Sequence, residues 1–238
     1  MADNKKRGIA YCVGVGPGDP ELMTLKACRL IRENEVIAVP GKDARAAVAY
    51  KIAVKAVPEL AEKELAAIEM PMVKDSEILR ASHRKAADII ERFLDDGRNV
   101  VYLTLGDSTI YCTFSYIQHI LEAEGYEVEL VSGITSFCAT AARLGVSLTE
   151  WNEALHVVPA LHNTGKDALA WPGNYALMKS ASKMPEVKKM LSEKDLDVCA
   201  AENCTMETEK LYRSVDEIPD DAGYFTLIIA KEKKESSI

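Results

Sequence analysis

Residues 9–27 read IAYCVGVGPGDPELMTLKA, and this stretch decides the fold. The apolar run over 9–15 predicts a buried strand, and three glycines within 14–18 predict a tight turn in which the backbone passes close to another backbone segment or to a ligand. The residues that follow have helical periodicity. We expect that helix to bury the side chains of Leu22, Leu25, Cys28 and Ile31. A strand, a turn and a helix in this order are typical of a parallel α/β sheet.

The same alternation continues through the first part of the chain. Further strands are predicted over 36–39, 100–105 and 128–131. One helix is predicted over 44–57. A second includes residues 89–94 and ends at Gly97, and a third follows Asp107 and ends at Gly125. We therefore expect an N-terminal α/β domain with a parallel sheet over residues 1–131.

After Gly145 the pattern changes to short strands separated by polar loops. Strands are predicted over 155–158, 175–178, 198–201 and 224–230, with one clear helix over 185–191. This pattern predicts a C-terminal α+β domain over residues 132–238. A further helix, predicted over 135–144, fits either domain, so the boundary near residue 131 stays open.

Composition excludes several classes of protein. The chain has 238 residues and a formal net charge of −8, and a negative field repels polyanions, so a dedicated nucleic-acid binder is excluded. No apolar run approaches the ~20 residues of a membrane helix, so we expect no membrane partner. Six scattered cysteines without a CxxC pair predict neither a disulfide framework nor a zinc site, and they favour a reducing cytoplasm.

The first glycine loop resembles a dinucleotide-binding loop only superficially. That spacing requires a glycine where Asp19 stands, and Asp19 and Glu21 place negative charge where a pyrophosphate would bind. The second strand also ends at Pro40 and Gly41 without the acidic residue that would hold a ribose. A nicotinamide dehydrogenase is therefore excluded, and we expect Asp19 to cap the first helix, with Pro20 at its first position.

Two more glycine loops follow predicted strands. The first is Leu105-Gly106-Asp107-Ser108-Thr109-Ile110-Tyr111, and the second is Ser132-Gly133-Ile134-Thr135-Ser136-Phe137. In open α/β sheets ligands bind at the carboxyl ends of the strands, which favours a binding site here. The alternative is that Asp107, Ser108 or the hydroxyls of the second loop only cap the next helix.

Five motifs, taken together and in order, resemble the tetrapyrrole methylases that use S-adenosylmethionine. They are GVGPGDPELMTLKA (14–27), LGDSTIYCTFSYI (105–117), VELVSGITSFCATAARLG (128–145), NYALMK (174–179) and AENCTMETEKLY (201–212). The resemblance covers nearly the whole chain. It is nearest to the enzymes that methylate carbon 20 of precorrin-2 or cobalt-factor II in cobalamin biosynthesis. One departure is that the usual Gly-Asp-Pro is Gly106-Asp107-Ser108 here, which removes a rigid residue from the loop.

The resemblance implies a homodimeric α/β enzyme of two domains with the methyl donor in a cleft between them. It also implies which residues contact the donor: Pro17, Gly106, Asp107, Ile110, Thr135, Ser136, Met178, Cys204 and Thr226. Carbonyls, hydroxyls and one carboxylate suit a positively charged sulfonium better than the lysines of a phosphate site would. S-adenosylhomocysteine would be the product.

Methyl transfer from a sulfonium to carbon needs positioning more than acid or base help. The acceptor carbon must lose a proton after the attack, but Tyr111, Tyr116 and His119 fit packing or surface roles as well, so we assign no catalytic base. The tetrapyrrole carries many carboxylates, and local positive charge must overcome the net charge of −8. Candidates for contacts to the substrate are Lys42, Arg45, His162 and Lys166.

Two other functions stay open at this point. One is another methylase of the same family, acting on uroporphyrinogen or on a later corrin intermediate. The other is a non-catalytic sensor that binds S-adenosylmethionine. No metal site is predicted in the protein, since a metal would arrive inside the substrate, and the sequence leaves open whether the substrate already carries cobalt.

Overall fold

A computed structural model describes residues 6–71, 73, 75–159 and 169–233 of the chain. The chain divides into two compact units, Met1–Thr135 and Ser136–Ile238, which we call the first and second units. Among the described residues, no helix is both long enough and apolar enough to cross a bilayer.

The first unit is built on a parallel sheet of five strands in the order β3-β2-β4-β1-β5. Its strands are β1 (Ile9–Gly14), β2 (Val36–Pro40), β3 (Glu64–Ile68), β4 (Val100–Thr104) and β5 (Glu127–Val131). The predicted α/β class is confirmed, as are four of these strands. The edge strand β3 was not predicted, because its glutamate and alanines have low β propensity.

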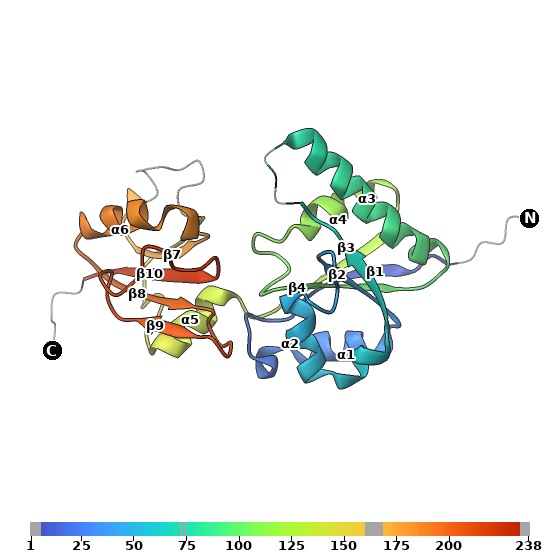
Figure 1. Ribbon diagram of the computed structural model, residues 1–238, viewed down its shortest axis with the longest axis horizontal. Helices are drawn as coiled ribbons and strands as arrows, with labels where there is room; N and C mark the ends of the chain where they lie inside the picture. The colour runs from blue at the N-terminus through green and yellow to red at the C-terminus, as the bar shows by residue number, and fades with distance from the viewer. Residues whose placement is uncertain (1–5, 72, 74, 160–168, 234–238) are drawn as a thin grey trace, which may run out of the picture. The chain divides into compact units, whose positions relative to one another are not determined.

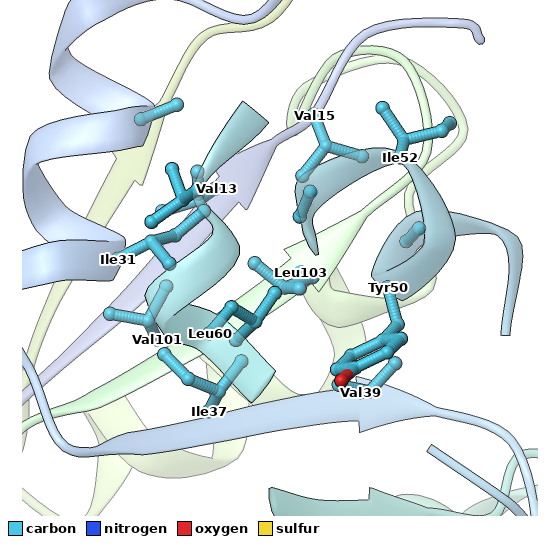
Figure 2. Packing of buried hydrophobic residues seen from close by; sticks show 14 of the residues in the cluster. Val13, Val15, Ile31, Ile37, Val39, Tyr50, Ile52, Leu60, Val101 and Leu103 are labelled. Atoms are coloured by element: carbon cyan, nitrogen blue, oxygen red, sulfur yellow. The ribbon is translucent and has the colours of Figure 1, made fainter. Parts of the chain in front are cut away.

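Helices cover both faces of this sheet. On one face lie α1 (Leu25–Glu33) and α2 (Val48–Ala56), and on the other lie α3 (Ser76–Asp95) and α4 (Phe114–Ala123) (Figure 1). Figure 2 shows the first of these cores, where Val13 and Leu103 of the sheet pack among Ile31 of α1 and Ile52 of α2. The short 3₁₀ turns η1 (Pro20–Leu22) and η2 (Pro58–Glu62) complete this layer. The inner strands β1, β2 and β4 are therefore covered on both faces, as their continuous apolar runs require.

The predicted start of α1 is wrong, and its predicted buried face is confirmed only for Ile31 and Cys28. Asp19 caps the separate turn η1, where its side chain accepts a hydrogen bond from the Glu21 N–H at 2.8 Å. The helix itself begins at Leu25 after the cap residue Thr24, whose hydroxyl accepts from the Ala27 N–H. Leu25, the first residue of the helix, is 90% exposed, and the buried face is formed by Ala27, Leu30 and Ile31.

Two other helices also start later than predicted. The helix expected directly after Asp107 begins only at Phe114, and residues 107–113 form a loop. The helix expected over 44–57 begins at Val48. The predicted stops are confirmed, because Gly97 and Gly125 follow α3 and α4 with φ of +77° and +78°.

The second unit has a mixed sheet in the order β6-β7-β10-β8-β9, in which β6 and β7 pair in parallel and the other neighbours pair antiparallel. Its strands are β6 (Leu155–Pro159), β7 (Asn174–Met178), β8 (Leu196–Glu202), β9 (Lys210–Tyr212) and β10 (Thr226–Glu232). Four of them were predicted, although β10 begins two residues later than expected, and the three-residue β9 was not predicted.

Two α-helices pack in the described part of the second unit. The helix α5 (Ser136–Leu144) contacts β8 and β10, and α6 (Met184–Ser192) follows the turn η4 (Ala181–Lys183). Met184, Val187 and Leu191 of α6 enter the core. The predicted helix over 185–191 is thus confirmed.

Candidate functional site

Three glycines meet where strands β1, β4 and β5 of the first sheet end. They are Gly14, Gly106 and Gly133, and we call their contact the glycine junction. A Cβ atom built on Gly133 would lie 2.2 Å from the Gly106 carbonyl oxygen, and one built on Gly14 would lie 2.6 Å from the same atom. Both distances are far below van der Waals contact, so only glycine fits at these two positions.

The first glycine loop folds back onto the second. The Gly106 N–H donates to the Gly16 carbonyl oxygen at 2.8 Å, and the Gly16 N–H donates to the Gly106 carbonyl oxygen at 3.1 Å. Both residues have positive φ, +76° at Gly16 and +73° at Gly106, a backbone conformation that residues with a side chain rarely adopt. This bridge and the glycine junction together explain why the first loop has glycine at both position 14 and position 16.

The junction lies at a topological switch point of the sheet. Strands β1 and β4 are neighbours, but the chain leaving β1 leads to β2 on one side, whereas the chain leaving β4 leads to β5 on the other. Connections that diverge in this way leave a crevice outside the carboxyl ends of the strands, where α/β proteins bind ligands.

Asp107 ties two of the loops together. Its Oδ2 accepts a hydrogen bond from the Gly133 N–H at 2.8 Å, and its Oδ1 accepts from the Thr109 N–H at 2.7 Å and from the Thr109 hydroxyl. The residue is only 7% exposed. Because α4 begins only at Phe114, with Thr113 directly before it, Asp107 does not cap that helix. The capping alternative is therefore wrong for Asp107, whose carboxylate instead joins the loop after β4 to the loop after β5.

Buried hydroxyls without partners lie in the same two loops. Among the described residues, Ser108 Oγ and Thr135 Oγ1 are buried and accept or donate no hydrogen bond within the protein. Buried polar atoms are nearly always hydrogen-bonded, so an unpaired hydroxyl at the carboxyl ends of the strands points to a ligand contact. Of the other residues expected here, Pro17 is buried, whereas Ile110 and Ser136 are partly exposed.

The second unit brings its three expected donor contacts to one edge of its own sheet. Met178 is the last residue of β7, Cys204 follows the end of β8, and Thr226 is the first residue of β10. Because β10 runs antiparallel between β7 and β8, these three positions lie at the same edge. Thr226 is 2% exposed, and its hydroxyl has no partner among the described residues.

Left-handed backbone is concentrated at this edge. Lys179, Asn203 and Thr205 have φ of +58°, +50° and +64°. Such conformations cost roughly 1–3 kcal/mol each and occur most often at functional sites. They flank Met178 and Cys204, which supports a binding role for this edge.

An ion pair holds the strained loop around Cys204. Glu209 Oε1 accepts a hydrogen bond from the Thr205 N–H at 2.7 Å, and Arg143 Nε of α5 donates to both oxygens of Glu209 at 3.0 Å. The Arg143 guanidinium lowers the pKa of Glu209 below its ordinary value. This pair was not predicted, because its members lie 66 residues apart, in two different motifs, and neither motif by itself indicates the contact.

The four expected substrate contacts differ in their surroundings. Lys42 is exposed, and its Nζ lies 3.3 Å from Glu69 Oε1. The Arg45 guanidinium donates to the Tyr50 hydroxyl at 2.8 Å and to the Ala61 carbonyl oxygen at 3.0 Å. His162 and Lys166 lie outside the described residues.

A cavity of about 250 Å³ lies near the ends of β2 and β3. It is lined by Lys42 and also by Lys85 of α3, which the sequence did not single out. Glu69 lines the same cavity and offsets the charge of Lys42, so the charged side chains of the lining sum to one positive charge.

The comparisons with known proteins agree on one family. The family model described as "Tetrapyrrole (Corrin/Porphyrin) Methylases" matches residues 10–218. A probable cobalt-precorrin-2 C(20)-methyltransferase of Methanocaldococcus jannaschii is 33% identical, and the match covers 97% of this chain and 99% of that protein. A precorrin-2 C(20)-methyltransferase of Sinorhizobium is 26% identical, with coverage of 94% and 95%.

A solved structure has the same fold. The uroporphyrin-III C-methyl transferase of Thermus thermophilus, complexed with S-adenyl homocysteine, superposes with a TM-score of 0.67. It is 22% identical to this chain, and the match covers 94% of this chain and 98% of that one.

Proposed function

The chain belongs to the tetrapyrrole methylases, and from this membership we propose that it methylates carbon 20 of precorrin-2 or cobalt-factor II in cobalamin biosynthesis. The observation that carries the choice of substrate is the full-length similarity to two proteins named for that reaction. Another methylase of the family, acting on uroporphyrinogen or on a later corrin intermediate, is the alternative.

S-adenosylmethionine is the methyl donor of this family, and its sulfonium supplies an already activated methyl group. The glycine junction fits such a cation, because it offers backbone carbonyls, the Asp107 carboxylate and the unpaired hydroxyls of Ser108 and Thr135. A pyrophosphate fits less well, since the Asp19 carboxylate already accepts the Glu21 N–H of the first loop.

We propose that the donor contacts expected from the sequence serve this role. In the first unit these are Pro17, Gly106, Asp107, Ile110 and Thr135, and Ser136 follows directly as the first residue of α5. In the second unit they are Met178, Cys204 and Thr226. Their task is to hold the methyl carbon in line with the attacking carbon, because the leaving thioether is neutral and needs no proton. No residue is assigned as the base that removes the proton from the acceptor carbon.

The acceptor's carboxylates need local positive charge in a chain with a net charge of −8. We propose Lys42 for this role, supported by its exposed side chain and by the second lysine, Lys85, that lines the same cavity. Arg45 would act from its fixed position beside Tyr50. His162 and Lys166 keep the role expected from the sequence.

The test is a methyl transfer assay with isotopically labelled donor. Precorrin-2, cobalt-factor II and uroporphyrinogen III are each incubated with the protein, and the position of the label is read by NMR. A label on carbon 20 supports the proposal, and the faster of the first two substrates shows whether the natural acceptor carries cobalt. A label on another carbon assigns a different methylase, and donor binding without turnover assigns a sensor.

We also propose that the protein is a homodimer in the cytoplasm. Both proposals rest on the family resemblance, and the second also on six cysteines that form no disulfide. Light scattering should give about twice 26.1 kDa. A mass of one chain over a wide range of concentrations would contradict the dimer.

A further inference from the structure

Two cysteines that are far apart in the sequence lie against each other where β1 contacts the loop over 107–113. Cys12 belongs to β1, and Cys112 belongs to the loop over 107–113 that precedes α4. Their sulfur atoms are 3.9 Å apart, although the residues are separated by 100 positions. The S–S bond of a disulfide is ~2.05 Å long, so the two sulfur atoms must move about 1.9 Å closer together.

The two thiols differ in reactivity. Cys12 is fully buried, and burial raises the pKa of its thiol. Cys112 is partly exposed, and the hydrogen bond from Cys12 lowers its pKa to about 6, with help from the Thr104 hydroxyl at 3.3 Å. Cys112 is therefore the thiolate that reacts first with an oxidant, and Cys12 lies where it can then attack the oxidised sulfur.

The surroundings of Cys112 allow the necessary movement. It lies in a loop outside any regular helix or strand, directly after Tyr111, whose φ is +50°. Moving Cys112 toward β1 therefore shifts the loop backbone, but it breaks no ladder of hydrogen bonds between strands. Cys12 is held by its strand, so Cys112 is the partner that moves.

We propose that Cys12 and Cys112 form a reversible dithiol–disulfide site that is oxidised by a small peroxide. The Cys112 thiolate attacks one peroxide oxygen and the O–O bond breaks, which leaves a sulfenic acid and, after protonation, water. The Cys12 sulfur then attacks the sulfenic sulfur, the S–S bond forms, the S–O bond breaks, and the Cys12 proton leaves with the departing hydroxide as water. Two thiols and one hydrogen peroxide thus give one disulfide and two waters, and an external dithiol reverses the reaction.

Oxidation would change the donor site, a consequence that rests on the proposed function. The loop that carries Cys112 also carries Asp107 and Ile110. A disulfide to β1 would pull this loop away from its present position, in which the hydrogen bond from the Gly133 N–H to Asp107 holds it. We expect the oxidised protein to bind S-adenosylhomocysteine about tenfold more weakly than the reduced protein.

The test uses the full chain treated with hydrogen peroxide. Remaining thiols are alkylated, and peptides are mapped by mass spectrometry without reduction. We expect a Cys12 to Cys112 link in the wild type and in Cys138→Ser, which removes an exposed cysteine as the matched control. The link must be lost in Cys112→Ser and in Cys12→Ala, and a dithiol must restore free thiols.

A peroxide-treated protein without this link, or with Cys138 oxidised first, would overturn the proposal. Calorimetry with S-adenosylhomocysteine then separates the disulfide from the proposed function. If the reduced protein fails to bind, the proposed function fails while the peptide map still decides the disulfide. If the linked protein binds as tightly as the reduced one, the disulfide has no effect on the donor site and that part of the proposal is wrong.

Discussion

The Asp107 carboxylate accepts a hydrogen bond from the Gly133 N–H at 2.8 Å, although 26 positions separate the two residues. Gly133 also lies against Gly14 and Gly106, so one point of contact joins the ends of β1, β4 and β5. The edge of the sheet is thus fixed by the protein's own contacts. A donor that binds there meets a surface that is already ordered, which lowers the entropic cost of binding.

Asp107→Ala, which removes a carboxylate, should weaken donor binding more than Thr109→Ala, which removes a single hydroxyl. Asp107→Ala leaves the N–H groups of Gly133 and Thr109 without their acceptor. We expect a loss of ~1.5–3 kcal/mol, about ten- to a hundredfold in affinity for S-adenosylhomocysteine. Calorimetry measures the affinity and a melting curve measures the stability. Thr109→Ala is the control, and an equal effect of both variants on affinity would contradict the role of Asp107.

Gly133→Ala should disrupt the junction, whereas Gly125→Ala should not. The new Cβ at position 133 would lie 2.2 Å from the Gly106 carbonyl oxygen, so the backbone must shift. At position 125 nothing lies within 4 Å, and only the positive φ is unfavourable, by ~1–2 kcal/mol. Donor affinity measured by calorimetry should fall at least about tenfold in the first variant, at ~1.4 kcal/mol, and stay unchanged in the second. Unchanged affinity in both would show that the junction is not the donor site.

Glu209→Gln should reduce stability in a way that depends on pH. Because Arg143 lowers the pKa of Glu209 in the folded state, the carboxylate stabilises the fold above its unfolded pKa of about 4.3, and this stabilisation is lost as the pH falls through the folded pKa. Urea unfolding should therefore show the variant about 1 kcal/mol less stable near pH 7. The difference should shrink as the pH falls below about 4. A difference that is constant from neutral to acid pH would contradict this account.

Leu25→Ala and Leu30→Ala test the corrected face of α1. Leu25 is 90% exposed and Leu30 is 4% exposed. Truncating the buried leucine should cost ~2–5 kcal/mol of unfolding free energy. Truncating the exposed one should cost less than about 0.5 kcal/mol. Similar losses in urea unfolding would mean that the helix lies with the face that its sequence periodicity alone predicts.

S-adenosylhomocysteine should bind and NAD should not. The first loop places the Asp19 carboxylate on the Glu21 N–H, which a phosphate would otherwise accept. Calorimetric titration of each ligand measures the difference. Tight binding of NAD without a response to S-adenosylhomocysteine would contradict both the choice of donor and the assignment of the loop.

The sequence predicts the central strands well because their burial leaves a local signal. The strands β1, β2 and β4 are continuous apolar runs, since helices cover both faces of the sheet. The edge strand β3 lacks that run, so the sequence does not predict it. The predicted start of α1 is wrong because Pro20 begins a separate turn, and the true cap, Thr24, lies four residues further on.

The sequence predicts the segments of the candidate site but not their arrangement. Glycines after three predicted strands indicate a candidate ligand site, and the structure brings Gly14, Gly106 and Gly133 together. Two contacts were not predicted, because each joins residues that are far apart along the chain: Asp107 with Gly133, and Arg143 with Glu209. Such contacts depend on the packing of whole elements, which local periodicity does not encode.

The most direct measurement is a crystal structure of the chain with S-adenosylhomocysteine. We predict that the ligand lies at the carboxyl ends of β1 and β4, with polar atoms within hydrogen-bonding distance of Gly106 or Asp107 and of the Thr135 hydroxyl. Ligand density at a site that touches none of these residues would contradict the assignment of the donor site.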